Sequence, residues 1–457
     1  MNYVANTSED IALMIKDIAS SVKNAPSSID DLFSDIPGNL RLKNLDLPGA
    51  LSEIEITSKM KSHLSKNLTY DNCKSFMGGG SYEHFIPSVV SAVIGRSDFY
   101  TAYTPYQPEV SQGTLMSIFE YQTMICNLTG MEVSNASHYD GATAMAESMV
   151  MAHNINSRRE FMIAESVNPM YMSVVETYAK AANFKLHVIP YDGKTGNLDA
   201  DFIKENMNDS ISAVIVQNPS FLGIIEDFRW LAETIHNNGS IFVVSANPIS
   251  LGLFNAPSSY GADIVCGDGQ PLGIPSSYGG PSLGFMACTQ KHLRKIPGRI
   301  VGETVDKNGK RAYVLTIQAR EQHIRREKAS SNICSNQALC ALAATVYLSY
   351  MGPQGLNKVA GRCSDLAHYM ASKISGVKGF EVKFEGSSFF NEFVVSYPKT
   401  LSFEKMFDHF AAANILAGVD ISKYFISEAN CMLVCTTEMR TKEDIDAYVK
   451  CLEAIKW

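Results

Sequence analysis

Residues 241–266 read IFVVSANPISLGLFNAPSSYGADIVC. Two short apolar runs, Ile241–Ser245 and Ile264–Cys266, stand at the ends of this stretch, and a segment rich in small residues, proline and glycine separates them. Short runs that are apolar throughout are typical of parallel strands whose two faces are both covered by helices. This stretch therefore predicts two strands of a buried sheet.

The same pattern extends outward in both directions, from about residue 76 to residue 291. Short apolar runs alternate there with segments in which apolar residues recur at helical spacing. This alternation favours an α/β fold with a doubly wound, mostly parallel sheet. We expect further strands at 161–165, 185–190, 213–216 and 283–288, and helices at 169–182, 198–205 and 228–237.

The rest of the chain predicts a helical linker and a small C-terminal α+β domain. Helices are expected at 313–328, 337–351, 355–375, 403–413 and 442–455, and strands at 380–384, 392–397 and 432–436. The resulting domains are an N-terminal helical arm at 1–75, a large α/β domain at 76–330, and the linker with the small domain at 331–457.

The arm itself has few apolar positions. Thr7 and Asp10 form a capping pattern in front of a helix, and a second helix is expected between Leu51 and Leu68. Such an arm either packs on its own domain or wraps around a partner chain. Both arrangements fit the sequence.

Composition excludes several classes of protein. The 457 residues are 46% hydrophobic and 19% charged, which is unlike a disordered chain or a small disulfide framework. Lys and Arg total 39 against 47 acidic residues, so the chain lacks the basic field of a nucleic-acid binder. The longest apolar stretch, Ala338–Leu348, is too short to span a membrane.

Location and metal content are also expected from the sequence. The first ten residues contain no basic or apolar leader pattern, and the ten cysteines are scattered without the spacing of a zinc site. We therefore expect a cytoplasmic protein with reduced cysteines and no metal.

Three loops rich in glycine and tyrosine are candidates for binding. The first, Phe76–His84, contains three consecutive glycines that permit a close approach to a ligand, although a flexible connection would look the same. The second, Tyr100–Gly113, carries tyrosines on a segment stiffened by prolines and suits either packing or a ligand-facing lip. The third, Tyr139–Thr143, opens a helix and could receive an anion there, a weak signal by itself.

Common catalytic motifs are missing. The sequence contains no glycine fingerprint after a strand, no Walker loop and no nucleophile elbow. Nor does it place a nucleophile, a base and an orienting group in one recognisable array.

The loops nevertheless resemble one family, the glycine decarboxylase P-protein of the glycine cleavage system. The resemblance covers essentially the whole chain, and the length is similar to that of the separate α chain (subunit 1) in the two-subunit form of this family. The segments that carry it are Ala102–Gly113, Tyr121–Met124, Tyr139–Thr143, Val216–Pro219, Tyr278–Pro281, Gln318–Gln322 and Ser331–Asn336.

This resemblance implies a fold-type-I pyridoxal-phosphate architecture and an activity. The family is a glycine dehydrogenase (aminomethyl-transferring, decarboxylating), an oxidoreductase acting on the CH–NH2 group. Glycine loses CO2 with pyridoxal phosphate as electron sink, and the aminomethyl group passes to the lipoamide of H-protein. The implied partners are therefore the β subunit (subunit 2), lipoylated H-protein and glycine.

The resemblance also implies that this chain lacks the lysine that holds the cofactor. No lysine occurs between Ile241 and Gln290, and setting the chain against the catalytic half of the family places Gln270 at the lysine position. Asn247 stands where an aspartate would hold the pyridine nitrogen. Pyridoxal phosphate is therefore expected on the partner β subunit.

A chain without the lysine can still complete its partner's pocket, because active sites of this fold type lie at the subunit interface. The residues expected to reach across are Tyr103, Thr104, Pro105, Tyr106, Gln107, Tyr139, Gly79, Gly80 and His84. Two alternatives stay open: an independent enzyme, and a structural or regulatory pseudoenzyme that only stabilises its partner. An anion site remaining at Gly141–Thr143 is also left open.

Overall fold

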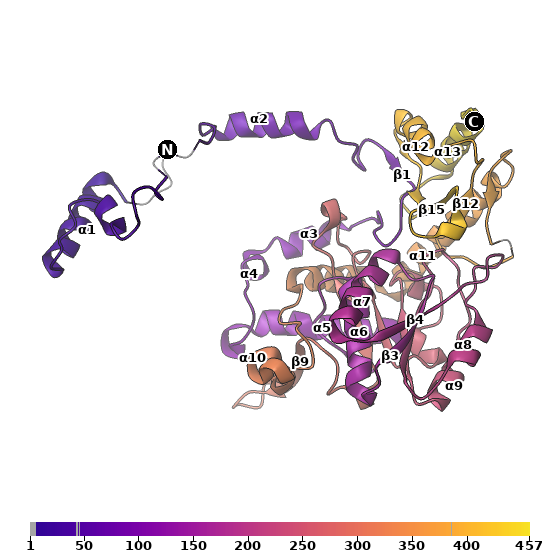
Figure 1. The fold of residues 1–457 in the computed structure, drawn as a ribbon, viewed down its shortest axis with the longest axis horizontal. Helices are drawn as coiled ribbons and strands as arrows, with labels where there is room; N and C mark the ends of the chain where they lie inside the picture. The colour runs from indigo at the N-terminus through magenta and orange to yellow at the C-terminus, as the bar shows by residue number, and fades with distance from the viewer. Residues whose placement is uncertain (1–5, 43, 45, 385) are drawn as a thin grey trace. The chain divides into compact units, whose positions relative to one another are not determined.

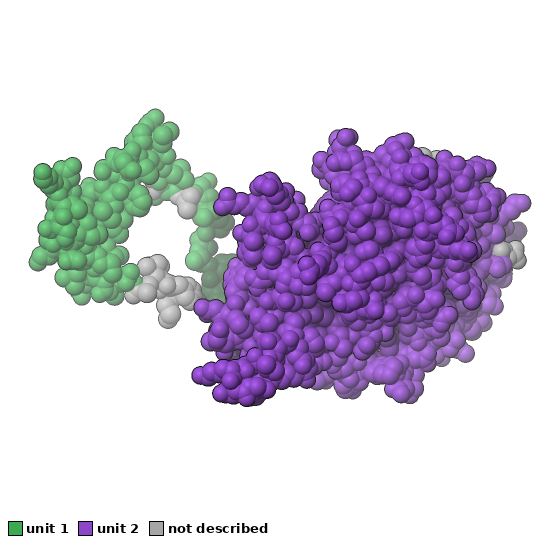
Figure 2. Space-filling view, turned by 90° about the horizontal axis from the view of Figure 1, so that it is seen from below, with its two compact units in different colours: residues 1–67 green, residues 68–457 purple. Residues whose placement is uncertain are grey.

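The computed structural model describes residues 6–457 except 43, 45 and 385, and the chain forms two compact units that meet in the sequence at Asn67 and Leu68 (Figure 2). The first unit contains helices α1 (Ser8–Ser21) and α2 (Glu53–Leu64). Thr7 and Asp10 exchange hydrogen bonds in the predicted capping box, which confirms the start of α1. Most apolar side chains of this unit are exposed, and Ile15 is an exception.

The second unit is built on a seven-stranded sheet (Figure 1). Strands β3 to β7 run parallel to one another, as the sequence predicts for most of the sheet, and β8 pairs antiparallel with both β7 and β2. In spatial order the strands are β2 (Val133–Ser134), β8 (Gly284–Cys288), β7 (Ile264–Asp268), β6 (Ile241–Ser245), β5 (Ile211–Gln217), β3 (Glu160–Ala164) and β4 (Lys185–Ile189).

The central strands are buried on both faces, which explains their unbroken apolar runs. Every residue of β6 is buried, and Val243 and Val244 pair with Ile264 and Val265 of β7. Helix α6 lies against β5, β7 and β8, and α9 lies against β6. The helices joined to this sheet are α3 (Ser88–Ile94), α4 (Ser97–Tyr100), α5 (Gln112–Thr129), α6 (Gly141–Asn156), α7 (Pro169–Ala182), α8 (Ala200–Asn206) and α9 (Arg229–Asn237).

The segment after the sheet corrects one prediction. Residues 313–328 are not one helix, because β10 (Arg311–Thr316) pairs antiparallel with β9 (Ile300–Val305). Only a short α10 (Gln322–Arg325) and single 3-10 turns follow. Burial along β10 alternates, with Tyr313 and Leu315 inside, so the period is two residues and indicates a strand.

The C-terminal part forms a second, antiparallel sheet with its own core. Its strands are β11 (Glu381–Val382), β12 (Glu392–Ser396), β15 (Cys431–Cys435) and β14 (Val419–Asp420), and β1 (Lys74–Ser75) pairs separately with β13 (Ile415–Leu416). The helices here are α11 (Ala338–Ile374), α12 (Phe403–Ala412) and α13 (Lys442–Ala454). Gly352 and Pro353 kink α11 between the two helices predicted there.

No helix in the part of the chain that the structure describes is long and apolar enough to cross a membrane. All ten cysteines are free thiols, and six of them are buried.

Candidate functional site

The carboxyl ends of four strands converge on a small cavity, the strand-end cavity. Asn168 follows β3, Gln217 ends β5, Asn247 follows β6 and Asp268 ends β7. Ligands of doubly wound sheets bind at this edge. The cavity measures only about 30 Å³, room for no more than about two water molecules.

Gln270 lies beside this cavity and is fully engaged in hydrogen bonds. Its Oε1 accepts from the backbone N–H of Tyr82 at 2.9 Å, and its Nε2 donates to the carbonyl oxygens of Tyr82 at 2.9 Å and Ile274 at 2.7 Å. Only 5% of the residue is exposed. The carboxamide therefore ties the loop Phe76–His84, which we call the glycine-rich loop, to the sheet edge.

Asp268 occupies the amino-terminal end of α6. Its Oδ2 accepts from the Gly141 N–H at 2.9 Å, and its Oδ1 accepts from Ser282 Oγ at 2.6 Å and from the Gln270 N–H at 2.8 Å. Burial raises the pKa of Asp268 in spite of these donors. The anion site considered at Gly141–Thr143 is thus occupied by a carboxyl group of the chain itself.

Asn247 and Tyr139 also lie at this edge. The Oδ1 of Asn247 accepts from the Ile249 N–H at 2.9 Å and so forms a local turn after β6. Tyr139 is half-buried directly before Asp140, the residue that caps α6 through the Thr143 N–H at 2.7 Å. Gly80 lines the strand-end cavity, and the Asn168 side chain donates to the Gly79 carbonyl at 3.0 Å.

The glycine-rich loop is held from its other side by two acids of the C-terminal part. Glu392 accepts from the Gly79 N–H at 2.7 Å and from the Tyr82 hydroxyl at 2.7 Å, and burial raises its pKa to about 7. Glu438 lies 2.7 Å from His84 Nδ1 and accepts from the Phe85 N–H at 2.8 Å. Gly79 and His84 are thus engaged within this chain.

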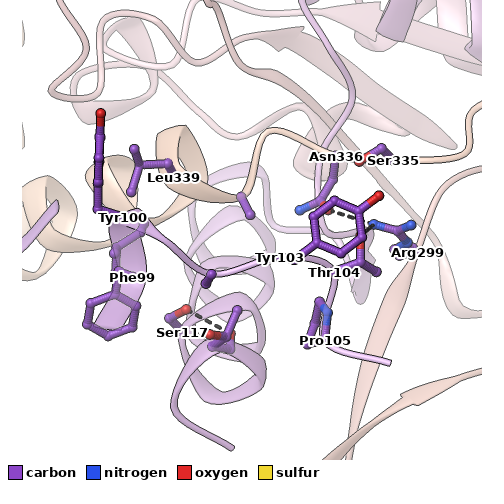
Figure 3. Close-up of a pocket in the computed structure, with 14 residues that line it drawn as sticks. Phe99, Tyr100, Tyr103, Thr104, Pro105, Ser117, Arg299, Ser335, Asn336 and Leu339 are labelled. Carbon is purple, nitrogen blue, oxygen red and sulfur yellow. Dashed lines mark hydrogen bonds between the residues drawn. The ribbon is translucent and has the colours of Figure 1, made fainter. Parts of the chain in front are cut away.

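A larger cavity, of about 180 Å³, lies beside the segment Tyr100–Gly113, which we call the tyrosine loop (Figure 3). We call it the Arg299 cavity, because Arg299 is its one charged lining residue among those described. The guanidinium is turned toward Thr104 and Asn336. The lining residues are Phe99, Tyr100, Ala102, Tyr103, Thr104, Pro105, Thr114, Ser117, Arg299, Ser335, Asn336, Ala338, Leu339 and Leu342.

The structure therefore separates the predicted site residues. Tyr103, Thr104 and Pro105 line the Arg299 cavity, and Tyr106 accepts a hydrogen bond from Arg299 at 3.3 Å. Tyr103 is 87% exposed, and Gln107 is also exposed. Their reach into a partner's pocket stays a prediction.

Sequence reasoning missed Arg299, Asp268 and Glu392. The sequence does contain one indication that Arg299 is buried: the arginine directly precedes Ile300 and Val301, the buried apolar residues that begin β9. The roles of Asp268 and Glu392 depend on long-range contacts that no local pattern reports.

Known proteins resemble this chain over nearly its whole length. The family model described as "Glycine cleavage system P-protein" matches residues 1–452. A protein of Listeria innocua serovar 6a named "Probable glycine dehydrogenase (decarboxylating) subunit 1" is 49% identical over 431 residues, 94% of this chain and 95% of that protein. A protein of the same name from Desulforamulus reducens is 47% identical over 459 residues, with both chains covered completely.

Solved structures similar to this chain include a member of the same family. A crystal structure of "glycine decarboxylase (P-protein) of the glycine cleavage system, in inhibitor-bound form" superimposes with a TM-score of 0.90 at 40% identity and covers 99% of both chains. A sphingosine-1-phosphate lyase of Burkholderia pseudomallei shares only the fold, with a TM-score of 0.66 at 12% identity over 90% of this chain and 92% of the lyase. The predicted fold-type-I pyridoxal-phosphate architecture is thereby confirmed, and the chain belongs to the glycine cleavage system P-protein family.

Proposed function

We propose that this chain is the subunit without the Schiff-base lysine in a two-chain glycine decarboxylase. It would act with a lysine-bearing β subunit, which binds pyridoxal phosphate, and would deliver the aminomethyl group of glycine to lipoylated H-protein. Family membership and the subunit 1 name of the relatives support the assignment. The ten free thiols fit a cytoplasmic location.

The observation that carries the proposal is the state of Gln270 and the space around it. A carboxamide forms no imine, and this one is hydrogen-bonded to the loop and the sheet edge. The strand-end cavity of about 30 Å³ is too small for pyridoxal phosphate, and Asp268 occupies the helix end where a phosphate would bind. The residues of this chain therefore do not fit the cofactor, whose chemistry is to act as an electron sink on the partner.

The tyrosine loop supports a shared pocket. Tyr100, Tyr103, Tyr106 and Val110 expose 70%, 87%, 52% and 81% of their surfaces. Exposed aromatic side chains gathered on one short segment are typical of a protein interface. We propose that the partner covers this segment and that Tyr103–Gln107 shape its glycine pocket.

The test is glycine-dependent exchange of labelled CO2 with lipoylated H-protein. We expect no exchange by this chain alone, none by the β subunit alone, and exchange by the two together. Exchange by the isolated chain would contradict the proposal.

The Gln270→Lys variant is a matched control for the missing lysine. We expect no cofactor absorbance from this variant alone, because the new amine would meet a cavity too small for the cofactor and Asp268 in place of a phosphate site. Binding of pyridoxal phosphate by the variant alone would show that the lysine was the only missing part.

A scaffold that never touches its partner's pocket is the second candidate. The internal engagement of Gly79 and His84 favours it, since these residues already have structural partners. Tyr106→Phe and Tyr103→Phe separate the two functions. Unchanged exchange by both assembled variants would favour the scaffold, and a loss of exchange without loss of assembly would favour the shared pocket.

A further inference from the structure

Arg299 is a buried cation without an acidic partner. It is 4% exposed, and no carboxylate of the described residues lies within ion-pairing distance, 4.0 Å, of its guanidinium. Arg440, the other arginine classed as buried, is 3% exposed and donates to Glu83 at 2.7 Å. A buried charge is stable only when an opposite charge or strong hydrogen bonds compensate it. Arg299 therefore lacks the carboxylate partner that Arg440 has, and its guanidinium lies instead over the ring of Tyr106, 5.5 Å from the ring centroid.

The hydrogen bonds of Arg299 are long and go to neutral groups. Its Nη1 lies 3.3 Å from Thr104 Oγ1 and 3.4 Å from Asn336 Oδ1, and its Nη2 lies 3.3 Å from the Tyr106 hydroxyl. Hydrogen bonds of charged groups in proteins are usually shorter than about 3 Å. The Nε is buried and has no partner among the described residues. The guanidinium is thus positioned but not saturated.

A second feature of the same cavity favours negative charge. Helix α11 begins at Ala338, and Ala338 and Leu339 line the cavity. Its cap residue, Gln337, makes no capping hydrogen bond with its side chain. The free N–H groups at the start of a helix carry partial positive charge and bind anions.

Size and lining narrow the class of ligand. The volume of about 180 Å³ is about six times that of the strand-end cavity, about 30 Å³, which suits a small molecule and not a cofactor with a ring and a phosphate. The walls add hydroxyl groups from Thr104, Ser117 and Ser335 and an amide from Asn336. A planar carboxylate matches the paired N–H groups of a guanidinium.

We propose that the Arg299 cavity binds the carboxylate of the amino-acid substrate. The inference rests on the proposed function, since the substrate arrives with the partner's active site. A phosphate is also an oxyanion, so the partner's cofactor is the alternative source of the charge, and the experiment separates the two.

The experiment uses the assembled complex of this chain with its β subunit. Arg299→Gln removes the positive charge, and Arg299→Lys keeps the charge but removes the paired N–H groups of the guanidinium. The matched control is Arg311→Gln, which removes an exposed arginine on β10. Assembly is measured by size-exclusion chromatography, KM for glycine by CO2 exchange, and cofactor affinity by absorbance titration with pyridoxal phosphate.

For Arg299→Gln we expect assembly and cofactor affinity to be unchanged and the KM for glycine to rise about 10- to 100-fold, the effect of one hydrogen bond to a charged group. Arg299→Lys should recover part of this loss, and Arg311→Gln should match the wild type. An unchanged KM for glycine overturns the inference, and a fall in cofactor affinity with unchanged KM assigns the anion to the cofactor phosphate. The wild-type complex tests the proposed function separately, since its activity does not depend on these variants.

A probe of the isolated full chain covers the case in which the variants fail to assemble. Sodium acetate should raise the thermal midpoint of the wild-type chain above that in sodium chloride of equal ionic strength, and glycinamide, which lacks the carboxylate, should not. Arg299→Gln should abolish the acetate effect while Arg311→Gln retains it. An acetate effect that survives in Arg299→Gln, or none in the wild type, overturns the inference.

Discussion

Glu392 is a single buried carboxyl group that joins the glycine-rich loop to β12. Burial raises its pKa to about 7 from an ordinary 4.5, so the folded chain holds a proton that the unfolded chain releases between those two values. For an acid whose pKa rises on folding, the free energy of unfolding falls as the pH climbs through this window. Ionisation of Glu392 therefore lowers the free energy of unfolding as the pH rises from about 4.5 to about 7, and the full loss is present above pH 7.

The prediction is a pH-dependent gain for Glu392→Gln. Between pH 5 and pH 8 the free energy of unfolding of this variant should improve relative to the wild type by up to about 3 kcal/mol, because an amide loses no proton. Urea unfolding at several pH values measures the difference, and Glu404→Gln on the exposed side of α12 is the control. A difference that does not change with pH would show that Glu392 is already ionised at pH 5.

At the scale of single residues, the sequence singled out Gln270, whose place at the lysine position stays a prediction, and could not single out Arg299. The resemblance to the P-protein family placed Gln270 at the position of the Schiff-base lysine, and a carboxamide there is informative without any structure because it forms no imine. For Arg299 the sequence offers only its place before the apolar start of β9, and the missing acidic partner becomes visible only when the surrounding segments are in place.

Among the elements, the turn at Gly223 joins the large sheet to β12. Its φ is +87°, and a Cβ built there would lie 2.0 Å from the backbone oxygen of Glu392. We predict that Gly223→Ala lowers the free energy of unfolding by more than about 2 kcal/mol, since a backbone atom cannot rotate away as a side chain can.

Gly309 offers the control for this variant. It lies in the turn between β9 and β10 with a φ of +79°, and nothing lies within 4 Å of a Cβ built there. Gly309→Ala should therefore show the backbone strain alone, about 1 kcal/mol in urea unfolding. Equal losses in the two variants would mean that the chain around Gly223 yields to the methyl group.

The elements themselves were predictable where one period dominates. The bounds of β6 and α7 could be given from the sequence, because β6 is one short unbroken apolar run and the apolar residues of α7 recur at helical spacing. The helix expected at 313–328 was wrong because Tyr313 and Leu315 alternate within a segment too short to show a period, and pairing with β9 decides its structure.

For the whole molecule, the arm is the part that contributes least to a core. Leu13, Leu40, Leu42 and Ile54 expose 65%, 72%, 75% and 79% of their surfaces. Residues 68–457 contain the hydrophobic clusters around both sheets. Removal of residues 1–67 should therefore shift the thermal midpoint by less than about 2 °C.

The same truncation should weaken assembly with the β subunit at least about tenfold, because apolar side chains without internal partners are available to another chain. Calorimetry gives the first quantity and sedimentation of mixtures gives the second. A large fall in the thermal midpoint with normal assembly would mean that the arm packs on its own chain, the other arrangement that the sequence permits.

The small size of the strand-end cavity has a consequence for the evolution of this chain. A glutamine codon becomes a lysine codon by one base change, so a single mutation could place a lysine at position 270. The space is not restored by that change, because Asp268 and the loop tied to Gln270 would both have to move as well. Several simultaneous replacements are a far rarer event than one. A change at position 270 alone is therefore not expected to give this chain a cofactor site of its own.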